Sequence, residues 1–405
     1  MGAPCVAYAF FTGSPWASIG VTSITALMAR AALAGAHGEL DEAAYVDVQA
    51  AFAAAVGLAS VALALGGAGG AAVRGVPASV KAGFKLGFGV AVVAGQFGAA
   101  VSKGSGLARA RVADWGAADF GPRFAGAANV ANLAYALSHP WHWDAAALAL
   151  ALFVGAGAMR GKRLMPRGTP SGVEVLVFVA AATAVAAAAG YDGAVVGAPP
   201  ASQQTGLLPP LHQAALLDGK TWARLLRMCF GDSWLRLAFA AVAFAAVDFL
   251  QVVSVCASFE ADDGVQWSPD RELGAQGVAC VASGLAGGGP VGASLSRSCV
   301  ARLSGASSPR AGFFHGVFAI ALLPYARHVA TVPKAALAAV VLAAVLPGIL
   351  QPTAILKLNR ADAAVAGATA LASVLTDPTT GFVFGLTLAT AARFASGPVA
   401  AKRAE

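Results

Sequence analysis

The chain has 405 residues, of which 58% are hydrophobic and 12% are charged, and its formal net charge is +7. A soluble domain carries about 25% charged residues, so this chain has too little charge to cover a water-facing surface. The basic residues stand between apolar runs instead of gathering on one face, which favours membrane orientation over nucleic-acid binding. The composition predicts an all-α polytopic membrane protein and excludes a soluble enzyme.

The cysteines and the N-terminus add little chemistry. None of the cysteines forms a Cys-x-x-Cys pair, and most lie inside apolar runs, at Cys5, Cys229, Cys256, Cys280 and Cys299. Small buried side chains explain these positions better than disulfides or a zinc site, so we expect no metal and no cofactor. Met1 leads into an uncharged stretch without a basic leader, so no cleavable signal peptide is expected.

Apolar segments occur along the whole chain. A membrane-spanning helix needs about 20 largely apolar residues, and shorter pieces suffice where helices are broken. Residues 124–137 predict an amphipathic or interfacial helix within a stretch of mixed charge, proline and apolar residues. The length rule gives about twelve candidate spans: 16–34, 48–68, 82–102, 143–159, 172–190, 237–259, 273–286, 293–309, 311–326, 335–350, 361–375 and 379–393.

One carboxylate lies in the middle of a candidate span. Asp248 is the only formal charge between Arg236 and Glu260. A lone carboxylate at that depth costs several kcal/mol unless it is protonated, paired or facing water. A site for a coupling ion or a proton is one interpretation of Asp248, and an acid paired with another helix to fix packing is the other.

A glycine-rich break with a nearby arginine is the second signal. No helix runs through Gly287, Gly288, Gly289 and Pro290, and a helical pattern resumes near Ser294. The resumed helix leaves free N–H groups and a positive dipole end inside the membrane. Serine hydroxyls and the charge of a nearby arginine complete the ingredients of an anion site, at Ser294, Ser296, Arg297 and Ser298. A close-packing glycine helix whose arginine extends to the interface is the alternative.

A second break of the same kind lies near the start of the chain. Gly13, Ser14 and Pro15 interrupt an apolar run just before a predicted helix that begins near Trp16. Paired broken helices indicate a transporter built from inverted repeats, with its binding site at the midplane. We therefore expect the helices that begin near Trp16 and Ser294 to face each other, and Asp248 to face the protein interior.

At these residues the chain resembles the sulfate permease (SulP) family of anion transporters. Ser268–Leu273 is similar to the family's Asp-Pro-Asn-Arg-Glu-Leu motif, and Ser294–Ser298 is similar to its tenth-span signature. The resemblance covers nearly the whole chain in family order. Its segments are Tyr8–Ser14, Gly83–Phe97, Lys162–Arg167, Ser268–Gly277, Ser294–Ser298, Val332–Leu337, Asn359–Asp362 and Leu375–Thr380.

The resemblance implies a uracil-permease-like fold of seven plus seven inverted spans, divided into a core and a gate domain. Residues 1–73 and 221–330 match the two parts of the core, and residues 74–220 and 331–405 match the two parts of the gate with a cytoplasmic tail. The match begins at the end of the second family span, so the first two spans are expected to be absent. The cytoplasmic STAS domain that usually follows the last span is also expected to be absent.

The resemblance also implies site residues. Asp248 matches the acid of the eighth family span, which is usually glutamate, and is the expected proton or coupling-ion site. The family's Gly-Pro in the third span is Gly20-Val21 here, and its Gly-Thr order is reversed at Thr12-Gly13. The implied anion-binding residues are Phe11, Ser14, Ser294, Leu295, Ser296 and Arg297.

The leading hypothesis is secondary transport of a small inorganic anion, either a sulfate-like oxyanion, bicarbonate or chloride. The expected mechanism is elevator-like movement of the core against the gate. The expected partners are a co-transported proton or sodium ion, the lipid bilayer and a second copy of the chain in a homodimer, with no nucleic acid. A nucleobase or organic-anion permease of the same fold is the first alternative, and a truncated, non-transporting remnant is the second. A membrane enzyme is disfavoured because His315 is the one histidine clearly inside a span and no His-Glu-x-x-His motif occurs.

Overall fold

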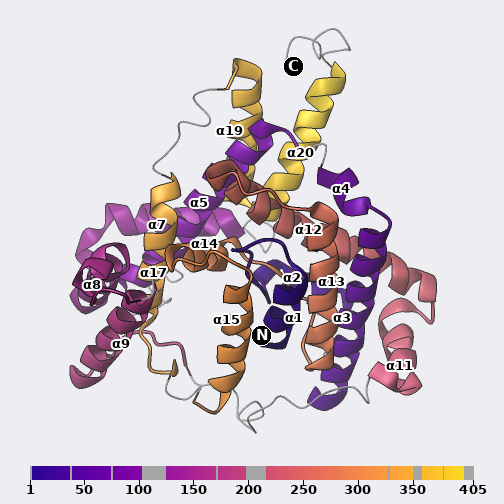
Figure 1. Ribbon diagram of the computed structural model, residues 1–405, viewed down its shortest axis with the longest axis horizontal. Helices are drawn as coiled ribbons and strands as arrows, with labels where there is room; N and C mark the ends of the chain where they lie inside the picture. The colour runs from indigo at the N-terminus through magenta and orange to yellow at the C-terminus, as the bar shows by residue number, and fades with distance from the viewer. Residues whose placement is uncertain are drawn as a thin grey trace. The chain divides into compact units, whose positions relative to one another are not determined.

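The computed structural model describes residues 2–36, 39–73, 76–102, 125–169, 172–197, 216–325, 329–349, 358–376 and 378–395. These residues form helices joined by short connections, together with one two-stranded antiparallel ladder and one isolated bridge (Figure 1). Contacts between residues divide the chain into two compact units. The first comprises residues 1–75, 199–302 and 306–326, and the second comprises 76–198, 303–305 and 327–405.

The first unit contains the two strands and most of the predicted polar residues. Its elements are α1 (Gly2–Phe11), β1 (Ile19–Gly20), α2 (Ser23–Ala32), α3 (Glu42–Leu65), α4 (Ala68–Val73), α11 (Gly219–Phe230), α12 (Trp234–Asp263), α13 (Pro269–Leu285), β2 (Gly292–Ala293), α14 (Leu295–Leu303), α15 (Arg310–Ala321) and the 3-10 turn η5 (Leu323–Tyr325).

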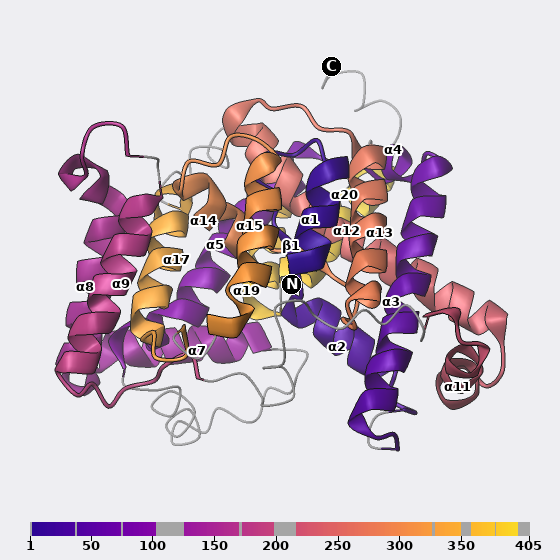
Figure 2. The same cartoon turned by 60° about the horizontal axis from the view of Figure 1, so that its bottom comes forward.

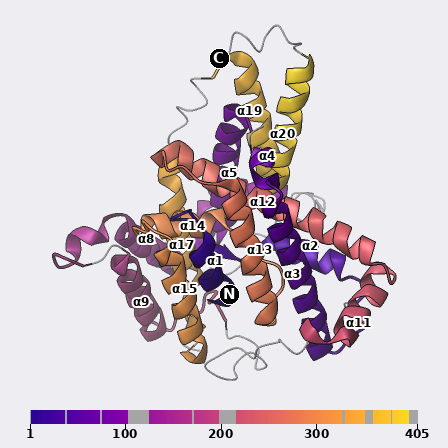
Figure 3. The ribbon, with the colours of Figure 1, turned by 45° about the vertical axis from the view of Figure 1, so that its right-hand side comes forward.

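The second unit is built around helix α5, which contacts most of its other helices. Gly83 and Gly87 of α5 allow the main chain of α19 to approach, since an added Cβ would collide with Ala366 or Ala370. Helices α19 and α20 lie side by side (Figure 3). The elements are α5 (Ala78–Val101), α7 (Ala125–Ser138), η2 (Pro140–His142), α8 (Ala145–Arg160), η3 (Gly161–Leu164), α9 (Val173–Ala188), α17 (Lys334–Ile349), α19 (Arg360–Leu375) and α20 (Pro378–Ala395).

Each predicted span corresponds to a helix, and the differences lie at the ends. Helix α3 begins at Glu42, earlier than predicted, because the Asp41 side chain caps it by accepting from the Ala44 N–H (3.2 Å). The first predicted span, 16–34, is wrong at its start, because α2 begins at Ser23. The short helix α1 was not counted as a span. A helix, α7, does occupy most of the stretch 124–137 that was predicted to be amphipathic or interfacial.

Four helices in the described residues are long and apolar enough to cross a membrane: Glu42–Leu65, Ala78–Val101, Ala145–Leu164 and Trp234–Ala257. Shorter apolar helices accompany them, at Gly2–Phe11, Val173–Ala188, Lys334–Leu346 and Thr380–Ala392. Short spans of this kind are typical of transporters with interrupted helices.

The same order of elements, helix–strand–helix–helix, occurs twice in the first unit. The first copy is α1–β1–α2–α3 and the second is α13–β2–α14–α15. The copies pack against each other, α3 on α13 and α1 on α15, and these four helices stand side by side (Figure 2). An antiparallel pairing of β1 with β2 joins them at the centre. This arrangement is that of two inverted repeats.

Both inter-repeat crossings depend on glycine. A Cβ on Gly57 of α3 would meet the main-chain oxygen of Gly277 on α13, and the reverse holds as well. Gly2 of α1 and Gly316 of α15 are related in the same way. In each of these helices a valine or isoleucine four residues after the glycine lies against the facing glycine. Small residues at such crossings let two main chains approach closely within a membrane.

Candidate functional site

The two interrupted segments meet at the two-stranded ladder. Ile19 pairs with Ala293 and Gly20 pairs with Gly292, and the Ser294 N–H extends the ladder by donating to the Ser18 carbonyl (2.9 Å). Each strand is followed directly by a helix, α2 or α14. The two broken segments therefore meet at the ladder, although the helix expected to begin near Trp16 begins at Ser23. Two helix starts, each with main-chain N–H groups that no helical carbonyl accepts, lie close to this junction.

The start of α2 is fixed by threonine side chains rather than by the Gly-Ser-Pro break. The Thr22 hydroxyl accepts from the Thr25 N–H (3.1 Å), and the Thr25 hydroxyl accepts from the Thr22 N–H (2.8 Å). This reciprocal capping box sets the helix start at Ser23. Trp16 lies in the extended segment before it, and its Nε1 donates to the Ala306 carbonyl (2.8 Å).

The start of α14 provides hydroxyls and a guanidinium. The Ser294 and Ser296 hydroxyl oxygens are 3.2 Å apart, and Ser294 Oγ accepts from the Arg297 N–H (3.4 Å). The Arg297 side chain crosses to the other repeat, where one terminal nitrogen donates to the Val21 carbonyl (3.1 Å). Its Nε and second terminal nitrogen are buried and have no hydrogen-bond partner among the described residues. Arg297 thus retains buried donors at the junction of the two repeats.

The other predicted anion-binding residues are placed differently. The Leu295 side chain is buried, with 8% of its surface exposed, so it packs in the interior. Phe11 and Ser14 belong to a separate contact group at the end of α1. Phe11 is half-exposed and its carbonyl accepts from Arg271 Nε (2.7 Å), and Ser14 Oγ accepts from the Ala17 N–H (3.2 Å).

That contact group is centred on Glu272, a residue that the sequence analysis noted only as part of a motif. Its buried carboxylate accepts from the Tyr8 hydroxyl (2.5 Å), the Thr12 hydroxyl (2.7 Å) and the N–H groups of Gly13 (2.7 Å) and Ser14 (3.0 Å). The available signal was an acid directly before the apolar predicted span 273–286. Glu272 therefore anchors the first break to the second repeat.

Asp248 lies in the interior of the first unit, as predicted, with none of its surface exposed. Its Oδ1 accepts from Gln251 Nε2 (2.8 Å) and its Oδ2 accepts from Gln276 Nε2 (2.7 Å). Gly292 of β2 lies so close that an added Cβ would collide with the Asp248 carboxylate. The donors to Asp248 are amides, whereas Arg297 is directed to a main-chain carbonyl, so these two charges form no ion pair with each other.

The polar groups form a continuous connection between the repeats. The Thr22 hydroxyl, at the cap of α2, donates to Gln251 Oε1 (3.1 Å), and Gln251 in turn donates to Asp248. Neither glutamine was singled out from the sequence. Gln251 stands among apolar residues, and Gln276 lies inside the Ser268–Gly277 segment without an assigned role. Their role becomes visible only when α12, α13 and β1 are brought together.

A cavity of about 200 Å³ in the first unit adjoins this junction and includes Val21, whose carbonyl binds Arg297. It runs along one face of α2 toward the start of α3. Its lining residues are Val21, Thr25, Ala26, Ala29, Arg30, Tyr45, Gln49, Gly289 and Pro290. The cavity has room for several water molecules, since one needs only about 10–15 Å³ of volume on this measure.

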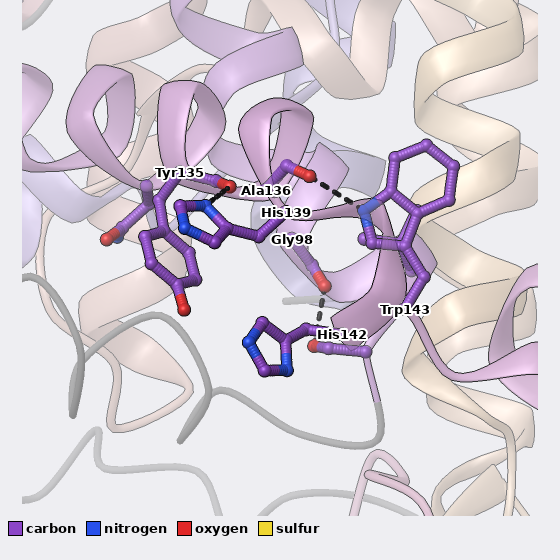
Figure 4. Close-up of a pocket in the computed structure, with 9 residues that line it drawn as sticks. Gly98, Tyr135, Ala136, His139, His142 and Trp143 are labelled. Carbon is purple, nitrogen blue, oxygen red and sulfur yellow. Dashed lines mark hydrogen bonds between the residues drawn. The ribbon is translucent and has the colours of Figure 1, made fainter.

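The second unit has a smaller, aromatic pocket of about 20 Å³ between α5 and the turn that joins α7 to α8 (Figure 4). The Tyr135 and His139 rings stack with centroids 4.2 Å apart, and Trp143 Nε1 donates to the Ala136 carbonyl (2.8 Å). The pocket has room for about one water molecule. In the described residues no group of three or more His, Cys, Asp or Glu side chains could hold a metal ion.

Interrupted helices that meet at a strand ladder, with inverted repeats around them, define a multi-pass membrane protein with a transporter fold. The sequence pattern of the "Sulfate permease family" matches residues 2–369, and the chain belongs to that family. Among curated proteins, it is 32% identical over 144 residues to the "Putative sulfate transporter YvdB" of Bacillus subtilis (strain 168). That alignment covers 34% of this chain and 27% of the relative, so the chain spans about a quarter of that relative's length.

Solved structures show the same fold. The transmembrane domain of a cyanobacterium bicarbonate transporter, BicA, matches with a TM-score of 0.54 at 20% identity, over 94% of this chain and 88% of that one. The overall structure of SLC26A9 matches with a TM-score of 0.59 at 14% identity, over 96% of this chain and 59% of that one. The structure of the murine SLC26A9 anion transporter in the inward-facing state matches with a TM-score of 0.59 at 16% identity, over 97% of this chain and 62% of that one.

Proposed function

We propose that the chain carries a small inorganic anion across the membrane, with the anion held between the starts of α2 and α14. The observation that carries this proposal is the position and incomplete hydrogen bonding of the Arg297 side chain. Two of its nitrogens are buried without a hydrogen-bond partner among the described residues, at the point where the two repeats meet. A guanidinium has five N–H donors and its planar fork suits oxyanions. An anion bound there satisfies donors that are otherwise left buried and unpaired.

The helix starts add to this attraction. The N-terminal end of a helix carries a partial positive charge, and its first N–H groups point at a ligand placed before it. Ser294 and Ser296 provide hydroxyl donors beside Arg297. These groups suit sulfate or bicarbonate, whereas a nucleobase needs acids and amides along its edge. Val21, whose carbonyl accepts from Arg297, also lines the cavity of the first unit.

We also propose that the first unit acts as the core and the second as the gate. In this proposal, elevator-like movement of the first unit carries the bound anion, and Asp248 is the site of a coupling ion. The support is that Asp248 and Arg297 belong to the same unit and that the Thr22–Gln251 contact connects them.

Uptake of labelled sulfate and of labelled bicarbonate into liposomes containing the purified chain tests this function. We expect Arg297→Lys to weaken the apparent affinity moderately, because the charge remains but the fork is lost. We expect Arg297→Gln to weaken it at least tenfold with normal protein yield, since one hydrogen bond to a charged group contributes about 1.5–3 kcal/mol.

Arg302 on the same helix is the matched control. Its guanidinium lies over the rings of Trp16 (6.0 Å) and Phe259 (5.4 Å), so Arg302→Gln removes the same charge from α14 without touching Val21. We expect Arg302→Gln to keep the wild-type affinity. If Arg297→Gln instead lowers thermal stability and leaves affinity unchanged, Arg297 is structural and the site is elsewhere.

A further inference from the structure

The two amides that contact Asp248 are not equivalent. Gln251 uses both ends of its amide, since its Nε2 donates to Asp248 and its Oε1 accepts from the Thr22 hydroxyl. Gln276 uses one end only. Its Nε2 donates to Asp248, while its Oε1 is buried without a hydrogen-bond partner among the described residues. One donor to Asp248 is therefore held in place by a third residue, and the other is not.

An amide offers a donor on one side and an acceptor on the other, and its terminal torsion is roughly two-fold. An ionised carboxylate only accepts hydrogen bonds, whereas a protonated carboxyl group also donates one. A half-turn of the Gln276 amide exchanges Nε2 for Oε1 beside Asp248 Oδ2. Gln251 cannot turn in this way without losing its bond to Thr22. Gln276 can turn at little cost, because its Oε1 has no bond to lose.

We propose that Gln276 is the positioning residue that allows Asp248 to take up and release a proton inside the first unit. In the ionised form Gln276 Nε2 donates to Asp248 Oδ2. A proton from water then forms the O–H bond at Oδ2, the Gln276 amide makes a half-turn, and the new O–H donates to Gln276 Oε1. Release of the proton to water reverses both steps. This inference rests on the proposed coupling role of Asp248 and identifies the coupling ion as a proton.

The contacts of Asp248 favour a proton over a sodium ion. Hard cations are held by several oxygen ligands, but both carboxylate oxygens of Asp248 face N–H groups, which repel a cation. Among the described titratable groups, Cys280 of α13 is the one placed beside Asp248, and its thiol donates to the Val291 carbonyl (3.4 Å). Glu272 on the same helix accepts from the Tyr8 hydroxyl of α1 instead, and Arg297 donates to the Val21 carbonyl. The strand β2 contributes Gly292 and Ala293, which do not titrate.

The test is the pH dependence of anion uptake into liposomes, measured for the wild-type chain and for Gln276→Leu. Leucine removes both the Nε2 donor to the ionised form and the Oε1 acceptor for the protonated form. The pH of half-maximal uptake should still move upward by about one unit, because the bond to the charged form is the stronger of the two by about that much. At a pH low enough to protonate Asp248 fully, the anion affinity should remain within about twofold of the wild-type value. A structural defect would change both the affinity and the pH midpoint, so a shift of the midpoint alone identifies a positioning role.

Gln251→Leu is the matched control. It also removes a donor to Asp248, but it frees Thr22 at the cap of α2 as well, so we expect it to weaken anion affinity in addition to moving the pH midpoint. Gln276→Asn, which keeps the amide on a shorter stem, should shift the midpoint less than leucine. An unchanged midpoint in Gln276→Leu overturns the proposal.

A second measurement works where a variant does not fold. Infrared titration of the purified wild-type chain should show a protonated carboxyl band that Asp248→Asn removes, and absence of that band at any pH overturns the proposal. Replacing sodium with choline should leave wild-type uptake unchanged. Uptake that needs sodium and ignores pH rejects the proton site but leaves anion transport standing, whereas no uptake of any anion rejects the proposed function itself.

Discussion

The two repeats of the first unit share a main-chain plan and differ in chemistry. In both, a helix that crosses its partner through glycine runs into a break, and a cysteine thiol of that helix donates to a carbonyl at or beside the following strand. Cys5 bonds the Ile19 carbonyl (3.1 Å) and Cys280 bonds the Val291 carbonyl (3.4 Å). The first break is held by Glu272, which belongs to the other repeat. The second break supplies Arg297 and the serines of the proposed anion site.

The first repeat is therefore the anchored side of the junction, and the second repeat is the charged side. The carboxylate of Glu272 satisfies the N–H groups of Gly13 and Ser14, so these groups are not available to an anion. The start of α14, in contrast, leaves two nitrogens of Arg297 unsatisfied. A symmetric scaffold can therefore hold an asymmetric site.

The largest effect should come from the shared part of the plan. Gly277→Leu and Gly316→Leu place a whole side chain where a single Cβ already collides with the facing main chain, so the two helices at each crossing cannot pack together. Both variants should lose most of the folded, monodisperse protein in size-exclusion chromatography, and to a similar degree. Gly367→Ala on α19, where an added Cβ meets no atom within 4 Å, is the control and should fold normally. A well-folded Gly277→Leu beside a collapsed Gly316→Leu would contradict the equivalence of the two crossings.

The next effect should separate the repeats. Glu272→Ala leaves four donors of the first repeat without their acceptor, and each buried unsatisfied group costs about 1–3 kcal/mol. We expect a large fall in the thermal unfolding midpoint. The control is Glu174→Ala in the second unit, a buried acid whose Oε2 accepts from the nearby Gly172 N–H (3.0 Å), and its fall should be much smaller. Equal falls would show that Glu272 is no special anchor.

The sequence was sufficient to predict most of the helices and the breaks, because apolar length and Gly-Pro interruptions are local signals, but it did not predict α1, α4 or α11. It also pointed to Asp248 and Arg297, because a charge inside an apolar run stands out by itself. Glu272, Gln251 and Gln276 could not be assigned in this way. Most of their partners lie in distant segments of the chain, and Glu272 and Tyr8 are 264 positions apart. The role of such a side chain depends on which helices pack together, and no periodicity in the chain reveals that.

The smallest effect concerns the bond that joins the two repeats beside the ladder. Ser298 Oγ accepts from the Ser18 N–H (2.9 Å) and donates to the Ser294 carbonyl (2.8 Å), so it ties the first break to the start of α14. Ser298→Ala leaves the Ser18 N–H without this acceptor, at a cost of about 1–3 kcal/mol, and loosens the segment that positions Arg297. We expect a modest fall in the unfolding midpoint together with a few-fold loss of anion affinity in the liposome assay. The control is Ser60→Ala on α3, whose buried hydroxyl donates to the Val56 carbonyl of its own helix (3.0 Å) and joins nothing else among the described residues. Ser60→Ala should change neither quantity appreciably, because a hydroxyl bonded within its own helix adds little stability. A fall in stability without any loss of affinity in Ser298→Ala would mean that the ladder supports the fold but does not position the anion-binding end of α14.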